Sequence, residues 1–303
     1  MLAVFYIGKR TLFDILRTGV FWIALGLTAA LCFIILFWGW HQVELEQRSY
    51  GHGTYTDMGP HGSMGYQEDN WNPLTKIEPE TWISYYVYGV TIMFANLLSI
   101  FIMMGLIGRE IDRRTVELLL ARPVSRGQIY LGKLLAGWMS LVLFMVVTLL
   151  WTMFCQVIGG MGLQPDYIKA WGVGVLSPII IGAMTYVMTI WMKGFLAGLI
   201  GTVVMIGSGT VGNLVIKLLG KEVLKLDLGV YVLYRILPPL NVIGQKAVEH
   251  IQTDAWFNFA KAFFEGMLPA AEDGIYTEMW QVWAYLGVVV LVGWLSFFRR
   301  QFS

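Results

Sequence analysis

The sequence predicts an all-α, polytopic membrane protein with six transmembrane helices, and three observations carry this prediction. Of the 303 residues, 57% are hydrophobic and only 14% are charged, and the mean hydropathy is +0.63. An ordinary soluble domain is about 45–50% apolar and about 25% charged. Six apolar stretches without charged residues are long enough, at about 1.5 Å per helical residue, to cross roughly 30 Å of hydrocarbon. We therefore expect a single membrane domain over residues 1–303.

The six expected spans follow one another along the whole chain. They are Val20–Trp40, Trp82–Ile107, Leu134–Val157, Ala170–Met192, Gly194–Ile216 and Val282–Phe298. The first is too long for the apolar region of a signal peptide and lacks a small-x-small cleavage site, so we expect it to be a retained anchor. Between the spans, residues 41–81 are rich in Gly and acidic residues and predict an exposed, partly irregular outer loop. Residues 217–281 are mixed, and the Pro238-Pro239 pair there predicts short interfacial or re-entrant helices within a second outer loop.

The distribution of Lys and Arg predicts the orientation of the chain. With the N-terminus inside, twelve of these residues fall on the cytoplasmic side, six of them in the connection 108–133. The two shorter outer loops carry only Arg48, Lys76 and Lys169, and the six in 217–281 count less because that stretch is long. Both termini are therefore expected in the cytoplasm, in a multi-pass protein of the plasma (cell inner) membrane.

Composition and motifs also predict what the chain does not do. The net charge is +1, which favours no nucleic-acid partner. The sequence has no Gly-x-x-x-x-Gly-Lys-Ser/Thr loop, so we expect no ATPase activity, no catalytic residues and no cofactor in this chain. The first five expected spans, which are the longest, contain no charged residue, and this argues against an ion-coupled carrier. Cys32 and Cys155 lie in apolar stretches and are expected to be buried free thiols.

The most informative segment is the cytoplasmic connection between the second and third spans. Glu110, Arg113, Arg114 and Glu117 follow an i, i+3, i+4, i+7 spacing, which predicts one charged face on a short amphipathic helix. Pro123 should end this helix at Arg122, after which the chain turns back toward the membrane. On spacing alone, a solvated connector that obeys the positive-inside rule explains the segment equally well.

The same segment resembles the coupling region of ABC-2 type permeases, the membrane subunits of ATP-binding-cassette transporters. In that family a Glu-rich helix with a Gly-Thr pair leads into Leu-Leu-x-x-Pro-x-Ser-Arg and then Gly-Lys. This chain departs from the pattern at Arg114, where the family usually has Gly. The matching residues are Glu110, Thr115, Glu117, Leu119, Leu120, Pro123, Ser125, Arg126, Gly132 and Lys133.

The resemblance implies a permease whose coupling helix docks on a separate cytoplasmic ATPase, which binds ATP and Mg. It assigns that contact to Glu110, Arg113, Arg114, Thr115, Glu117, Pro123, Ser125 and Arg126. It further implies export, a second permease copy in a homodimer, an N-terminal elbow helix over residues 1–19, and periplasmic or membrane accessory proteins as further partners. The alternative is a membrane anchor or scaffold subunit of a multiprotein complex without an ATPase.

Three smaller groups of residues are further site candidates. Thr91, Asn96 and Ser99 could line a substrate path, or could form hydrogen bonds between helices. Gly194, Gly198 and Gly201 could allow close approach of a second copy, or of a neighbouring helix in the same chain. In the first outer loop, imidazole and thioether groups could bind copper, although they follow no fixed ligand spacing; these residues are His52, Met58, His61 and Met64.

Overall fold

The computed structural model describes residues 2–51, 79–107, 125–158, 165–219, 237–240, 243 and 279–299. Within these ranges the regular structure is entirely helical, in agreement with the predicted class. The helices are α1 (Leu2–Leu16), α2 (Gly19–Gly51), α3 (Pro79–Leu106), α6 (Arg126–Ile158), α7 (Pro165–Gly174), α8 (Leu176–Trp191), α9 (Gly194–Leu219) and α13 (Met279–Arg299).

Five helical segments in the described part of the chain are long and apolar enough to cross a membrane. They are Gly19–Gly39, Tyr86–Leu106, Arg126–Ile158, Ile168–Trp191 and Gln281–Arg299. Each coincides with one of the expected spans, so the multi-pass membrane character is confirmed. The remaining expected span, 194–216, falls on α9, of which the apolar stretch Gly194–Ser208 is shorter. The count of six spans therefore stays a prediction.

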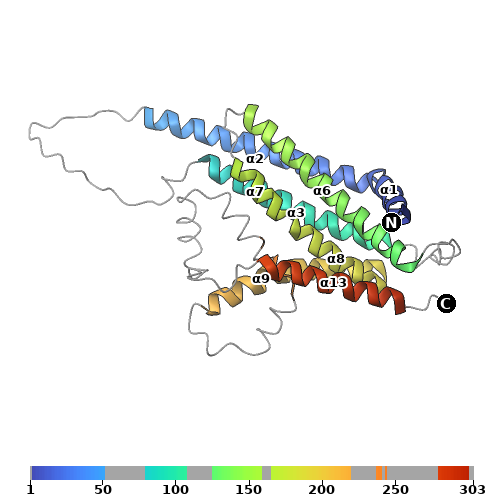
Figure 1. Ribbon diagram of the computed structural model, residues 1–303. Helices are drawn as coiled ribbons and strands as arrows, with labels where there is room; N and C mark the ends of the chain where they lie inside the picture. Colours follow the sequence, from blue (N-terminus) through green and yellow to red (C-terminus); the bar gives the residue numbers. More distant parts are fainter. Residues whose placement is uncertain are drawn as a thin grey trace, which may run out of the picture.

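The long helices lie side by side in one bundle (Figure 1). Helix α3 is central, since it packs against α2, α6, α8 and α9, while α13 packs against α8 and α6. Helix α1 packs mainly against α6. The beginning of α1 and the end of α13 lie at the same end of the bundle, together with the end of α3 and the start of α6 (Figure 1). We call this end the α1 end.

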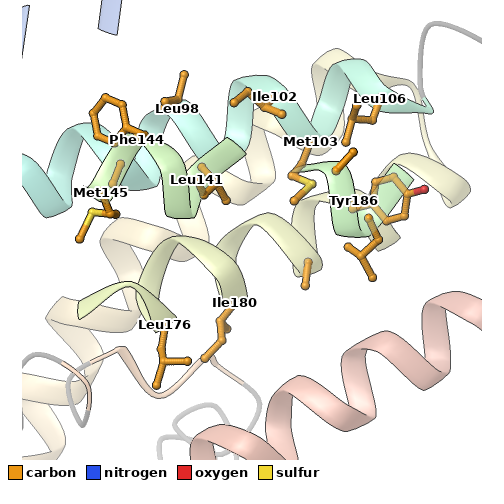
Figure 2. Close-up of a cluster of buried hydrophobic side chains, with 14 of the residues drawn as sticks. Leu98, Ile102, Met103, Leu106, Leu141, Phe144, Met145, Leu176, Ile180 and Tyr186 are labelled. Atoms are coloured by element: carbon orange, nitrogen blue, oxygen red, sulfur yellow. The ribbon is translucent and has the colours of Figure 1, made fainter. Parts of the chain in front are cut away.

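The core between α3, α6 and α8 is apolar and closely packed. Figure 2 shows side chains from these three helices meeting in one cluster, among them Met103 of α3, Leu141 of α6 and Ile180 of α8. Gly137 of α6 lets α6 and α3 approach each other, because a Cβ at this position would lie 2.5 Å from Cε of Met103 of α3. Such close contact is what holds helices together where lipid offers no hydrophobic gain.

The helices extend furthest beyond the expected spans at two places, and both expectations are corrected. Helix α2 continues to Gly51, so the first eleven residues of the expected loop 41–81 are helical. Helix α6 begins at Arg126, eight residues before the expected start at Leu134. In both cases charged residues end the charge-free stretch, but Glu, Lys, Arg and Gln are good helix formers, so the helix runs on outside the hydrocarbon.

The fourth expected span is interrupted at Val175, which separates α7 from α8. Pro178 explains the position of this break, because a proline ring clashes with the carbonyl of the residue four positions earlier, here Gly174, and has no N–H to donate to it. The chain nevertheless stays nearly helical, since the N–H of Val175 donates to the carbonyl oxygen of Trp171 at 3.0 Å. Pro178 thus produces a local break in this span.

Candidate coupling site at the base of helix α6

Helix α6 begins with a reciprocal capping arrangement. The backbone N–H of Gln128 lies 3.3 Å from Oγ of Ser125, and the backbone N–H of Ser125 donates to Oε1 of Gln128 at 3.1 Å. This is the capping box, which satisfies two N–H groups that a helix start otherwise leaves unpaired. The Ser-x-x-Gln spacing was visible in the sequence, so this signal could have located the start of α6.

Lys133 joins the start of α6 to the end of α3. Its side chain is only 5% exposed, and its Nζ donates to the backbone carbonyl oxygen of Leu106 at 3.1 Å. Leu106 is the last residue of α3, where carbonyl groups lack helical partners and the helix dipole favours a positive charge. The buried ammonium is therefore placed where the backbone can stabilise it.

Gly132, the preceding residue, joins α6 to α1. A Cβ on Gly132 would lie 3.1 Å from the carbonyl oxygen of Val4 and 3.1 Å from Cγ2 of Ile7. On the other side of the contact, a Cβ on Gly8 would lie 3.3 Å from the carbonyl oxygen of Gly132. The two glycines allow the backbones of α1 and α6 to approach closely, and any larger side chain would push them apart.

Tyr130 joins α6 to α8 and α13. Its hydroxyl donates to the carbonyl oxygen of Val290 at 3.3 Å, and its own carbonyl oxygen accepts a hydrogen bond from the hydroxyl of Tyr186 at 3.0 Å. The ring of Tyr130 also lies 5.8 Å from that of Phe297, between ring centroids. Gly293 leaves the space beside the Tyr130 hydroxyl that a Cβ would fill.

The first eight residues of α6 thus contact four other helices, and we call Arg126–Lys133 the α6 base. Arg126 adds a peripheral contact, because its Nη1 lies 3.5 Å from the carbonyl oxygen of Phe298, at the long end of the hydrogen-bond range. The chain enters residues 108–124 from the end of α3 and leaves them at the α6 base. The base offers no arrangement of groups for covalent chemistry, and what it can do is hold helices together.

Most of the residues predicted to contact an ATPase lie outside the described part of the chain. These are Glu110, Arg113, Arg114, Thr115, Glu117 and Pro123. Of the remaining two, Ser125 caps α6 and Arg126 is its first residue. The contribution of Tyr130 was missed, because the sequence did not show which helices surround this turn of α6. That of Gln128 was missed although its capping spacing from Ser125 was visible in the sequence.

The three substrate-path candidates on α3 are buried and hydrogen-bonded within the bundle. The Thr91 hydroxyl donates to the carbonyl oxygen of Val87 at 2.8 Å. Asn96 accepts from the Ser177 hydroxyl at 3.0 Å, and Ser99 donates to the carbonyl oxygen of Pro178 at 2.5 Å. Two of the three therefore link α3 to α8, which is the interhelical alternative. A role in a substrate path stays a prediction.

The glycine face of α9 packs inside the same chain. A Cβ on Gly198 would lie 2.7 Å from Sδ of Met104 of α3, and one on Gly201 would lie 2.5 Å from Oγ1 of Thr185 of α8. Gly194 is the first residue of this helix. The close approach that the small residues predict is thus made by neighbouring helices, and their use by a second copy stays a prediction.

The metal candidates His52, Met58, His61 and Met64 lie outside the described residues. Within the described ranges, no cluster of three or more His, Cys, Asp or Glu residues could hold a metal ion. Cys32 is a buried free thiol, as expected, and its Sγ lies 3.6 Å from Oγ1 of Thr91. Cys155 is also free, but it is half-buried beside the cluster around Cys32.

Comparison with known protein families agrees with this helical membrane architecture. A family model described as ABC-2 family transporter protein matches residues 11–301. The chain therefore belongs to this family, whose members are membrane components of ABC transporters and work with an ATPase component. The curated proteins contain no match to the chain.

Proposed function

We propose that this chain is the permease subunit of an ABC exporter and is driven by a separate cytoplasmic ATPase that binds ATP and Mg. The ATPase docks on residues 108–124, two copies of the permease form a homodimer around the substrate path, and both termini lie in the cytoplasm. Thr91, Asn96 and Ser99 remain the candidates for that path. The protein lies in the cell inner membrane.

The observation that supports coupling is the construction of the α6 base. A docking segment can move helices only if both of its ends are attached to them firmly. Here the end of α3 and the start of α6 are joined by the buried contact between Lys133 and Leu106. The same eight residues of α6 hold α1, α8 and α13, so a displacement of the segment acts on most of the bundle.

Charge supports the cytoplasmic placement of the α1 end. The exposed cations of the described residues at this end include Lys9, Arg10, Arg17, Lys193 and Arg299. Asp14 is the only acidic residue among the described residues there. An excess of Lys and Arg near span ends marks the cytoplasmic side of a membrane protein.

The test is purification of the tagged chain from its own membranes in mild detergent, with identification of partners and an ATP-hydrolysis assay. We expect an ATPase with nucleotide-binding motifs at equal stoichiometry. In the variant Glu117→Arg, bound ATPase and hydrolysis should be lost, while the amount of membrane-inserted chain is unchanged. The matched control is Glu44→Arg, in the part of α2 beyond its apolar span, which should retain both.

Two outcomes would count against the proposal. If the unchanged chain recovers other membrane subunits and no ATPase, the scaffold alternative replaces the permease. If Glu117→Arg retains the ATPase with full hydrolysis, residues 108–124 are not the docking site, whatever the chain transports.

A further inference from the structure

Helix α1 has an inner face that the bundle covers and an outer face that nothing in the described structure covers. On the inner side, Ile15 is buried and Leu12 and Leu16 pack against the core. The outer side carries three exposed aromatic residues together with three basic ones. They are Phe5 (72% exposed), Tyr6 (67%) and Phe13 (52%), with Lys9, Arg10 and Arg17.

The exposed side of α1 in the structure differs from the apolar side that a helical wheel of its sequence gives. On the wheel Phe13 belongs with Leu12 and Ile15, and Lys9 falls on the apolar side. In the structure Phe13 is exposed together with Lys9, whereas Leu12 and Ile15 pack in the core. The outer face is therefore mixed, with aromatic and cationic groups interleaved.

The contact with α6 places α1 at the edge of the hydrocarbon. Helix α6 has 33 residues and is about 50 Å long, whereas the hydrocarbon is about 30 Å thick. About 13 residues of α6 must therefore lie outside the hydrocarbon. The charged residues Arg126 and Lys133 indicate that the first eight residues of α6 are among them. Since α1 touches α6 at Gly132, α1 lies at the level where headgroups begin.

Exposed residues continue from the end of α1 onto α2, since residues 17–20 are all exposed. Nε1 of Trp22 donates to the carbonyl oxygen of Leu16 at 2.7 Å, which fixes the turn between the two helices. Trp22 and Ile23 are themselves 59% and 63% exposed on an apolar span. Exposed residues that lead from α1 directly onto a membrane span favour lipid as the occupant of this face over a soluble protein.

We propose that the outer face of α1 binds the headgroups of anionic phospholipids through Lys9, Arg10 and Arg17. The aromatic rings of Phe5, Tyr6 and Phe13 enter the interface between headgroups and acyl chains, where such rings are favoured. A juxtamembrane Lys or Arg strengthens attraction to an anionic surface roughly fivefold. Three of them account for an affinity difference of up to about a hundredfold between anionic and neutral lipid.

The experiment measures lipid binding to the purified full-length chain and needs no ATPase. Delipidated chain in detergent is titrated with phosphatidylglycerol or phosphatidylcholine, and bound lipid is counted by native mass spectrometry. The test variant is Lys9→Gln/Arg10→Gln/Arg17→Gln. The control, Lys169→Gln/Lys193→Gln/Arg299→Gln, removes the same charge from exposed positions outside α1.

We expect the α1 variant to lose at least tenfold in affinity for phosphatidylglycerol and to keep its weaker affinity for phosphatidylcholine. The control should lose less affinity for phosphatidylglycerol than the α1 variant, because its three charges lie on separate elements and form no common face with the aromatic residues of α1. Equal losses in both variants, or no loss in the α1 variant, would overturn the proposal.

Discussion

Lys133→Met is the sharpest perturbation of the α6 base. Methionine has a similar length and no charge, so it can occupy the buried site while removing the donor to the carbonyl oxygen of Leu106. The change leaves the capping box and the contact with α1 in place, because these involve other residues. The expected effect is therefore local to the end of α3.

The magnitude follows from the contact. A hydrogen bond from a charged donor contributes about 1.5–3 kcal/mol, and its position at a helix C-terminus adds about 0.3–1 kcal/mol. Part of this gain is offset, because the variant no longer buries a charge. A net loss of about 2 kcal/mol corresponds to a roughly thirtyfold increase in local opening of the last turn of α3.

Hydrogen exchange followed by mass spectrometry measures this opening directly. Amides in residues 103–107 should exchange about thirtyfold faster in Lys133→Met, while those of α8 keep the rates of the unchanged chain. Lys193→Met removes an exposed lysine from the same end and should leave both regions unchanged. Unchanged exchange at residues 103–107 in Lys133→Met would refute the view that this lysine secures α3.

Two further substitutions test the contacts around the site. Gly201→Leu should lower thermal stability in detergent by the cost of overpacking, about 1–3 kcal/mol, because its Cβ would meet Thr185, whereas Gly207→Leu, in open space, should be silent. Ser125→Ala removes the cap of α6 and should cost about 1 kcal/mol, seen as faster exchange of the amides next to Gln128; equal exchange would show that the cap contributes nothing.

The sequence predicted the positions of five spans because uninterrupted apolar length is itself the physical requirement for crossing a bilayer. It misplaced the start of α6 for the same reason. The search for charge-free residues stops at Lys133, but a helix needs only backbone hydrogen bonds and a cap, and both continue to Ser125. Hydropathy therefore predicts which residues cross the membrane, whereas capping residues predict where the helices begin and end.

It was harder to predict which neighbouring element covers a given face of a helix. The glycines of α9 indicated close approach by some helix, yet only the structure shows that Met104 and Thr185 occupy the space. The same holds for α1, where Phe13 is apolar but faces outward. A periodic pattern indicates that a helix has a small-residue or apolar face, and the three-dimensional arrangement of the other helices decides what covers that face.

Burial separates the last two residues of the segment 108–133 from any docking surface. Lys133 is 5% exposed and Gly132 lies beneath α1, so neither residue can touch a docked protein. They can act only on α3 and α1. A docking segment attached to loose helix ends would move without moving the spans. In the proposed coupling mechanism the Gly-Lys pair therefore has a role of its own: it attaches the start of α6 to α3 and α1, so that a movement of the docking segment reaches the membrane.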